Sequence, residues 1–411
     1  MNEKVTERLI RYAKIDTQSK ANVKEVPSTK KQFDLAYMLR DELVKIGAEN
    51  VWLDETNCVV YGEIPSNLEG KEGMAVGLIA HMDTSPDAPS ENIKPWVLKN
   101  YDGKDIVLNK ERGIVLKTSD YTFMDKYIGQ DLVLTDGTTL LGGDDKAAIA
   151  SVMTFAEYLI SHKEIKHGPV KLAFTPDEEV GGLACNLDLE RFGAEVAYTL
   201  DGDHAGYFSY ETFNAIEAQL DITGLNVHPG TAKGIMKNAL EIGCKFISML
   251  PDLERPEHTE GREGFYHPHY MEGNVEHANV LCLIRDHSEE RFNERKAYVE
   301  KCVEKLNEIY GEGTVKLTFA NGYFSMKKAV DKVPFMIDFL KKAISDSGIT
   351  PTELAFRGGT DGSAISQRGL PCPNLSAGYE NGHSRFEFVS VQTMAKNVAI
   401  LLKLIEEYSK I

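Results

Sequence analysis

The chain has 411 residues, of which 42% are hydrophobic and 27% charged, so it has the composition of an ordinary globular protein and enough length for two domains. Its formal net charge of −17 argues against nucleic acid as a partner, because a phosphate backbone requires a basic protein face. We expect no membrane partner and a cytoplasmic location, since no apolar run reaches membrane-spanning length and the six scattered cysteines form no CxxC pair.

The first part of the chain alternates between helical and strand-like segments. Helical spacing covers residues 3–15 and 29–46, and strand-like pieces follow over residues 51–64. Hairpins and loops are expected over residues 95–141, which are rich in turn signals. A helix is expected after the GGDDK stretch at 142–146, where apolar residues recur at i, i+3, i+4 and i+7. Three apolar runs are typical of buried strands, at residues 75–80, 170–174 and 196–200.

Past the third buried strand the pattern changes and indicates an inserted domain. Residues 213–323 have the pattern β-α-β-α-β, with residues 251–275 as their longest irregular loop. The chain then returns to helices and strands and closes with a helix over residues 391–409. The sequence therefore predicts an α/β fold with a mixed sheet and flanking helices, formed by residues 1–212 and 324–411, and a small α+β domain inserted between them.

Side chains of the kind that bind metal ions fall where the predicted strands end. In an open α/β sheet the carboxyl ends of adjacent strands meet at one edge, and ligands bind there. Two imidazoles and several carboxylates, without a thiolate, favour a hydrolytic zinc, manganese or cobalt site over a structural zinc site. The residues concerned are His81, Asp144, Glu178, Glu179, Asp201 and His383.

The stretch FTPDEEVGG, residues 174–182, packs three acids side by side. Adjacent carboxylates make each other harder to ionise unless a cation or a proton is nearby. Two metal ions about 3.5–4 Å apart would offset this charge, and such an ion lowers the pKa of its water to roughly 7. Residues i and i+2 of a strand share a face, so Asp83 is placed to accept the ring N–H of His81 and fix its tautomer.

Seven stretches of the chain carry a resemblance to a known enzyme family. They are HMDTSPD, LTDGTTLLGGDDKAA, FTPDEEVGG, LDGDHAGYFSYETFNA, GLNVHPGTAK, RGGTDGS and NLSAGYENGHSRFEFV. In order and spacing they resemble the co-catalytic zinc exopeptidases, a family that includes aminoacylases, carnosine-type dipeptidases, desuccinylases and tripeptide aminopeptidases. The sequences around the metal motifs are similar to the tripeptide aminopeptidases, over essentially the whole chain.

The resemblance implies a pair of zinc ions, with manganese or cobalt as substitutes, and a cis peptide bond between Asp144 and Asp145. It implies release of the N-terminal residue from tripeptides by a hydroxide shared between the metals, with Glu178 as general base and Asp83 orienting His81. The insert would serve as a lid or dimerisation domain in a homodimer. The implied metal ligands are His81 and Asp201 for one zinc, Glu179 and His383 for the other, and Asp144 bridging them.

Three further residues are candidates for holding the substrate. The resemblance makes His228 a donor to the tetrahedral oxyanion, although a histidine before a proline is otherwise a turn residue. Arg285 and Arg357 are candidates for a peptide carboxylate, because a guanidinium fork fits a carboxylate with two hydrogen bonds; surface salt bridges are the alternative. Four histidines cluster in the long loop region of the insert, where solvated side chains are commoner than a second metal site: His258, His267, His269 and His277.

Four hypotheses of function compete. The first is a tripeptide aminopeptidase, and the second is another hydrolase of the same metal family, such as a dipeptidase or an N-acyl amino acid hydrolase. The predicted metal residues fit both. A non-catalytic metal-binding protein would be expected to lack Glu178 or a ligand, and all of them are present. A metal-independent serine or cysteine hydrolase ranks last, because the chain has no GxSxG motif.

Overall fold

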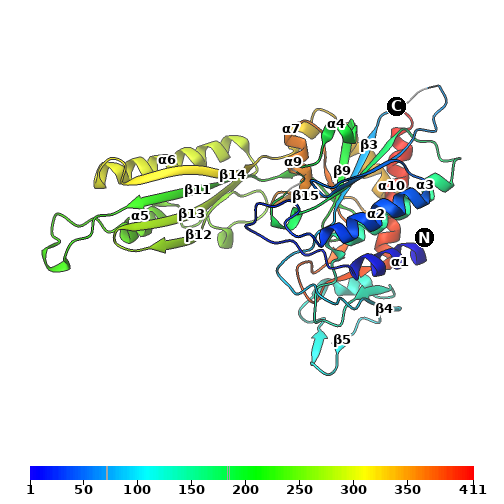
Figure 1. Ribbon diagram of the computed structural model, residues 1–411, viewed down its shortest axis with the longest axis horizontal. Helices are drawn as coiled ribbons and strands as arrows, with labels where there is room; N and C mark the ends of the chain where they lie inside the picture. Colours follow the sequence, from blue (N-terminus) through cyan, green and yellow to red (C-terminus); the bar gives the residue numbers. More distant parts are fainter. Residues whose placement is uncertain (71–72, 183, 185) are drawn as a thin grey trace. The chain divides into compact units, whose positions relative to one another are not determined.

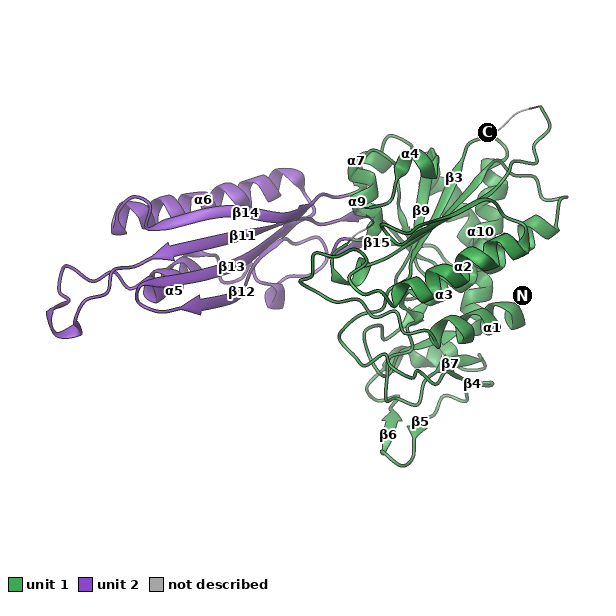
Figure 2. Cartoon of the chain, viewed as in Figure 1, with its two compact units in different colours: residues 1–210, 326–354, 360–411 green, residues 211–325, 355–359 purple. Residues whose placement is uncertain are grey.

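The computed structural model describes residues 1–70, 73–182, 184 and 186–411. The chain forms two compact units (Figure 2): unit 1 contains residues 1–210, 326–354 and 360–411, and unit 2 contains residues 211–325 and 355–359. The insert therefore begins and ends two residues away from the boundaries expected from the sequence. The return of residues 355–359 to unit 2 was not predicted; there the backbone N–H of Phe213 donates to the carbonyl of Gly358 at 3.3 Å.

The largest sheet is mixed, and eight of its strands lie within the described residues. In order across the sheet these are β1 (Glu49–Asp54), β2 (Val59–Ile64), β8 (Val170–Thr175), β3 (Val76–His81), β9 (Val196–Leu200), β16 (Asn374–Leu375), β10 (Tyr207–Thr212) and β15 (Thr352–Phe356). β3 pairs in parallel with both β8 and β9, whereas β1 and β2 pair antiparallel. The three strands predicted to be buried are thus direct neighbours in one sheet.

Helices cover both faces of this sheet (Figure 1). The first face shares a hydrophobic core with α1, α2, α3, α8 and α10, and the second packs against α4 and α9. The helices of unit 1 are α1 (Asn2–Ala13), α2 (Gln32–Ile46), α3 (Gly143–Ser161), α4 (Leu189–Phe192), α7 (Lys327–Val330), α8 (Phe335–Asp346), α9 (Asp361–Gln367) and α10 (Val391–Tyr408).

Strand β3 shows how the sequence produces these two faces. Successive side chains of a strand point to opposite sides, so Leu78 and Ala80 enter the core shared with α3 while Ile79 enters the core shared with α9. Gly77 lies on the side of α4, where an added Cβ would come within 2.6 Å of the Phe192 ring. The glycine therefore lets α4 pack directly on the strand that ends at His81.

Two small sheets occupy the region predicted as hairpins and loops, together with a later segment of the chain. One is formed by β17 (Tyr379–Glu380), β18 (Phe388–Ser390), β7 (Leu132–Leu134) and β4 (Trp96–Leu98), and the other by β5 (Ile106–Asn109) and β6 (Ile114–Leu116). Short 3-10 helices also occur: η1 (Thr122–Tyr127), η2 (Glu178–Val180), η3 (Pro229–Thr231) and η4 (Pro256–His258). The pairings of β17 with β18 and of β18 with β7 hold the chain on either side of His383 in place.

Unit 2 is an antiparallel sheet with two helices, the α+β arrangement that the sequence predicts. Its strands, in order, are β12 (Phe265–Gly273), β13 (His277–Asp286), β11 (Asn214–Thr223) and β14 (Val315–Tyr323), and its helices are α5 (Ala239–Met249) and α6 (Glu289–Tyr310). Alternate residues of β11, namely Ala218, Leu220 and Ile222, are buried in a core with both helices. Their neighbours Glu217, Gln219 and Asp221 belong to the opposite, polar face.

The prediction of one irregular loop over residues 251–275 is wrong. Residues 265–273 form β12, an edge strand paired with β13. The proline at position 268 disguised this strand, because proline is tolerated in sheets mainly at edges and bulges, and the register of β12 shifts directly after it. The order of elements in the insert is therefore β-α-β-β-α-β rather than β-α-β-α-β.

The described helices and cysteines bear on two expectations drawn from composition. No described helix has both the length and the apolar character needed to cross a membrane. Within the described residues all five cysteines are free thiols, with Cys244 exposed and the others buried. Cys185 lies outside the described residues.

Candidate metal centre

The strand ends of unit 1 bring the predicted metal-type residues together. β8, β3 and β9 are adjacent and parallel, so their carboxyl ends lie at one edge of the sheet. His81 is the buried last residue of β3, and Asp201 follows β9. Glu178 and Glu179 follow β8 and form the start of η2. Three separate segments thus deliver one imidazole and three carboxylates to the same edge.

Asp144 lies between the two predicted histidine ligands. It is the second residue of α3, where the backbone is not yet helical, and its peptide bond to Asp145 is cis, as the family resemblance implied. Its Oδ1 lies 3.1 Å from Nε2 of His81, and its Oδ2 lies 3.5 Å from Nε2 of His383. The same His383 nitrogen lies 2.7 Å from Oε2 of Glu179. One carboxylate therefore faces both imidazoles, with one oxygen for each.

Two groups of potential ligands share this aspartate. In each group, one ligand atom from every residue lies within 4.8 Å of the corresponding atoms of the others. The groups are His81, Asp144 and Asp201 on one side, and Asp144, Glu179 and His383 on the other. This division matches the two sets of ligands that the resemblance implied.

The acids of the centre hinder one another's ionisation. Burial, and then the negative charge of Asp144, raise the pKa of Glu179 to about 8 and that of Asp201 to about 6. Burial and the charge of Asp201 also raise the pKa of Glu178 well above its usual range. Hydrogen bonds to Asp144 and Glu179 favour the charged form of His383, whose pKa rises to about 11. The arrangement therefore carries more acid than its histidines neutralise.

This donor set fits a pair of divalent cations. Oε1 of Glu179 is buried and has no hydrogen-bond partner within the described part of the chain. Positive charge among these acids would allow them to ionise at neutral pH. Imidazoles and carboxylates without a thiolate are the ligands of hydrolytic zinc, manganese and cobalt sites.

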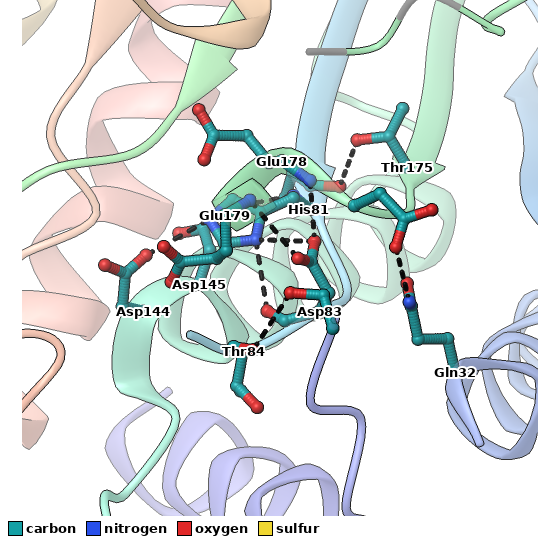
Figure 3. A network of polar contacts seen from close by, with 12 residues as sticks. Gln32, His81, Asp83, Thr84, Asp144, Asp145, Thr175, Glu178 and Glu179 are labelled. Carbon is teal, nitrogen blue, oxygen red and sulfur yellow. Dashed lines mark hydrogen bonds and ion pairs between the residues drawn. The ribbon is translucent and has the colours of Figure 1, made fainter. Parts of the chain in front are cut away.

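Asp83 has a wider role than the sequence predicted. Its Oδ1 lies 3.4 Å from Nδ1 of His81, and its backbone carbonyl oxygen is closer to that nitrogen, at 3.1 Å. The buried carboxylate also accepts the backbone N–H of Glu178 at 2.9 Å and that of Glu179 at 3.2 Å (Figure 3). Asp83 therefore fixes both glutamates beside the histidine at the end of β3.

The three adjacent acids of FTPDEEVGG have different partners. The carboxylate of Asp177 accepts hydrogen bonds from the backbone and the hydroxyl of Ser28 and from the side-chain amide of Gln32, which ties the loop to the start of α2. Glu179 faces His383. The carboxylate of Glu178 forms no hydrogen bond or ion pair with any described residue.

Two supporting residues escaped the prediction from sequence. Glu387 is buried, and its carboxylate accepts three backbone N–H groups of the loop 141–144, which presents Asp144. Tyr379 donates its hydroxyl to Oδ1 of Asp201 at 2.9 Å. The sequence contains one usable signal for Glu387, an acid between two phenylalanines, because a buried carboxylate needs hydrogen-bond donors.

The three predicted substrate-binding residues all belong to unit 2. His228 is exposed, and its Nδ1 accepts a backbone N–H two residues further on, at 3.1 Å. The guanidinium of Arg357 donates to three oxygen atoms of the loop 259–263, so its donors already hold that loop. Arg285 donates to the carbonyl of Arg357 at 3.2 Å and keeps a buried Nε without a partner within the described residues. Arg285 is therefore the better candidate of the two for a substrate carboxylate.

The four histidines of the insert that were considered for a second metal site, His258, His267, His269 and His277, form no metal-type group within the described residues. The rings of His267 and His269 on β12 have centres 5.9 Å apart, and Nε2 of His269 lies 3.1 Å from Oε2 of Glu217. His277 lies 3.4 Å from a carboxylate oxygen of Asp221. The geometry thus gives no support for a second metal site among these histidines.

The chain is similar to known peptidases over its whole length. A model of the peptidase dimerisation domain matches residues 210–314. Among curated proteins, Peptidase T of Caldanaerobacter subterraneus is 46% identical over 99% of both chains, and Peptidase T of Clostridium novyi is 48% identical over 99% of this chain and 100% of its own. Peptidase T of Geobacillus kaustophilus is 45% identical over 100% of this chain and 99% of its own.

Solved structures agree with this relationship at the level of the fold. The aminopeptidase PepT of Bacillus cereus matches with a TM-score of 0.78 at 23% identity, over 99% of each chain. A tripeptidase of Staphylococcus aureus gives the same TM-score at 20% identity, over 100% of this chain and 99% of its own. A Bacillus subtilis protein described as a dinuclear metal binding peptidase of the M20 family gives 0.66 at 12% identity, over 99% of each chain. These likenesses confirm the predicted fold, and the full-length identities to curated relatives establish that the chain belongs to the peptidase T family.

Proposed function

We propose that this protein is a zinc-dependent aminopeptidase that releases the N-terminal residue from tripeptides. Full-length relatives named Peptidase T support the substrate class. The single observation that carries the metal chemistry is the carboxylate of Asp144, whose two oxygens face the two histidines at 3.1 and 3.5 Å. A carboxylate in that position is suited to bridge two cations.

Each residue of the centre has a task in holding the cations. His81 and Asp201 would hold one, Glu179 and His383 the other, and Asp144 both. When bound, the cations supply the charge that polarises the scissile carbonyl and lowers the pKa of a water molecule to roughly 7. Asp83, through its contacts with His81 and with the backbone N–H groups of the two glutamates, keeps these residues in position.

Glu178 is the residue that we assign to proton transfer. Its backbone is fixed by Asp83 while its carboxylate has no partner among the described residues. It takes a proton from the water as the oxygen attacks the carbonyl carbon, and it returns that proton to the leaving amine as the C–N bond breaks. General-base assistance of this kind is worth about 10²–10⁴ in rate.

Two residues of unit 2 have side chains suited to recognising the charges of a peptide substrate. We assign His228 to the oxyanion of the tetrahedral intermediate and Arg285 to the C-terminal carboxylate of the peptide, because an N–H donor and a guanidinium are the groups that recognise those charges. The match of residues 210–314 to a peptidase dimerisation domain supports a homodimer. The free thiols support a reducing, cytoplasmic location.

A substrate panel tests this function. Ala₂, Ala₃, Ala₄ and N-acetyl-Ala₃ are incubated with the enzyme, with and without chelator, and zinc is then restored. We expect hydrolysis of Ala₃ that the chelator abolishes, zinc restores and N-acetylation prevents. Preference for Ala₂, or cleavage of the acetylated peptide, would instead favour a dipeptidase or an N-acyl amino acid hydrolase of the same metal family.

A further inference from the structure

A cavity of about 450 Å³ in unit 1 is lined by residues that the mechanism does not use. Its lining includes Lys126, His204 and Lys396 and no acidic side chain. This is unexpected in a chain with a formal net charge of −17. Within the described residues neither lysine ammonium forms an ion pair, so both charges are available to a ligand.

The third basic group, His204, is held in place by a hydrogen bond to Glu380, which raises the pKa of the histidine above its usual value. Its Nδ1 lies 2.6 Å from Oε1 of Glu380, a carboxylate only 1% exposed. The hydroxyl of Tyr127 donates to the same oxygen. The carboxylate of Glu380 is therefore compensated by His204 and Tyr127, and Glu380 itself is not among the lining residues.

The rest of the lining supplies neutral donors and an apolar wall. The side-chain oxygen of Gln392 accepts the backbone N–H of Asp131 at 2.9 Å, which leaves its amide nitrogen as a donor. Apolar surface comes from Ala205, Tyr207 and Ile349. The combination of two lysines, a histidine, a neutral donor and an apolar wall is the chemistry that recognises a small organic anion.

A metal ion is the competing occupant, because ligand atoms of Asp203, His204 and Glu380 lie within 4.8 Å of one another. The contacts argue against it. The same oxygen of Glu380 already accepts from both Tyr127 and His204, and a lysine lines the cavity beside that histidine. We propose that this cavity is a binding site for a small organic anion, a carboxylate or a phosphate monoester, separate from the metal centre.

The test measures binding to the zinc-loaded enzyme and localises it to this cavity. Inorganic phosphate and succinate are titrated in separate experiments, and the ring C–H signal of His204 is followed by proton NMR, after assignment with the variant His204→Gln. The double variant Lys126→Ala/Lys396→Ala is compared with Lys301→Ala/Lys316→Ala, which removes the same charge from exposed positions of unit 2. Following the His204 signal separates this cavity from any anion bound at the zinc ions.

We expect at least one anion to shift the His204 signal saturably, and we expect the Lys126/Lys396 variant to weaken that binding roughly tenfold or more while the control variant does not. A response to phosphate alone identifies a phosphate ligand, and a response to succinate alone identifies a carboxylate. The inference is overturned if neither anion moves the signal at up to about 10 mM, ten times a millimolar Kd. Equal affinity in the two double variants would overturn it as well.

Discussion

Two regions of the molecule contain the same residue types and use them in opposite ways. At the strand ends of unit 1, His81 and His383 face a group of carboxylates that outnumbers them, and Glu179 keeps a buried oxygen without a partner among the described residues. On the polar face of the unit 2 sheet, His269 pairs with a single carboxylate, Glu217. That glutamate also accepts hydrogen bonds from two side-chain amides, so its charge is satisfied within the sheet.

The comparison teaches what distinguishes a candidate metal centre from a cluster of histidines. The insert has six histidines in its sequence against two in the predicted centre, and yet it forms no metal-type group within the described residues. The number of imidazoles is therefore a poor guide. Buried acids that converge without enough counter-charge are a better one, because burying them together is costly unless a cation or a proton joins them.

The largest expected effect is that of replacing Glu178, compared with replacing its neighbour Asp177. Glu178→Ala should lower kcat for Ala₃ by about 10²–10⁴ and leave zinc content unchanged, because Glu178 transfers a proton and ligates nothing. Asp177→Asn, next to it, should keep kcat within a few-fold and lower the melting temperature, because its carboxylate fastens the loop to Ser28 and Gln32. Steady-state kinetics, metal analysis and calorimetry measure these effects. Near wild-type turnover in Glu178→Ala would remove the assignment of the general base.

The next effect compares a buried and an exposed orienting carboxylate. Asp83→Asn should cost about 10–100-fold in zinc affinity or activity. The backbone N–H groups of Glu178 and Glu179 bond to different carboxylate oxygens of Asp83, and asparagine has only one oxygen that can accept. Asp87, whose Oδ2 lies 3.0 Å from Nδ1 of His383, has a side chain that is 66% exposed, and water can replace it. Asp87→Asn should therefore have a clearly smaller effect. Equal losses in the two variants would mean that burial of the carboxylate is unimportant.

The excess of buried carboxylates should also affect how the stability of the metal-free protein depends on pH. The pKa of Glu179 is raised from 4.5 to about 8, and that of Asp201 from 3.8 to about 6. Between the unfolded and folded pKa values of these two acids, the folded protein binds more protons than the unfolded chain. The free energy of unfolding of the metal-free protein should therefore fall as pH rises from about 4 to 8. Calorimetry at several pH values measures the slope. Glu179→Gln should reduce it, and a slope unaffected by that substitution would contradict the cited shifts.

The smallest expected effect belongs to the histidines of unit 2. The double variant His267→Ala/His269→Ala should retain the full zinc content and wild-type kcat, and its stability should change by about 1 kcal/mol or less, as is usual for a partly exposed pair. Metal analysis and denaturant unfolding check both points. Loss of one zinc ion per chain in this variant would show that the histidines of unit 2 also bind metal.

The part of the centre that follows from strand ends could be predicted from the sequence. Apolar runs that stop at His81, before Glu178 and before Asp201 identify parallel strands, and parallel strands have their carboxyl ends at one edge. The assignment of a particular ligand to a particular cation came from the family resemblance, because side-chain direction in a loop has no periodic signature. The buried strands and the α+β insert were likewise predictable from hydrophobic patterning.

The rest depended on contacts between distant segments. Pro268 hid an edge strand whose existence depends on pairing with β13. The role of Arg357 follows from the return of residues 355–359 to unit 2, which local sequence does not reveal. Glu387 supports Asp144 from 243 positions away in the chain, and no spacing rule links the two.

The most direct test of the central claim is anomalous diffraction at the zinc edge from crystals of the zinc-loaded protein. We expect two peaks, one in contact with His81, Asp144 and Asp201 and the other with Asp144, Glu179 and His383. A single peak, or peaks that do not share Asp144, would contradict the proposed pair of cations bridged by one carboxylate.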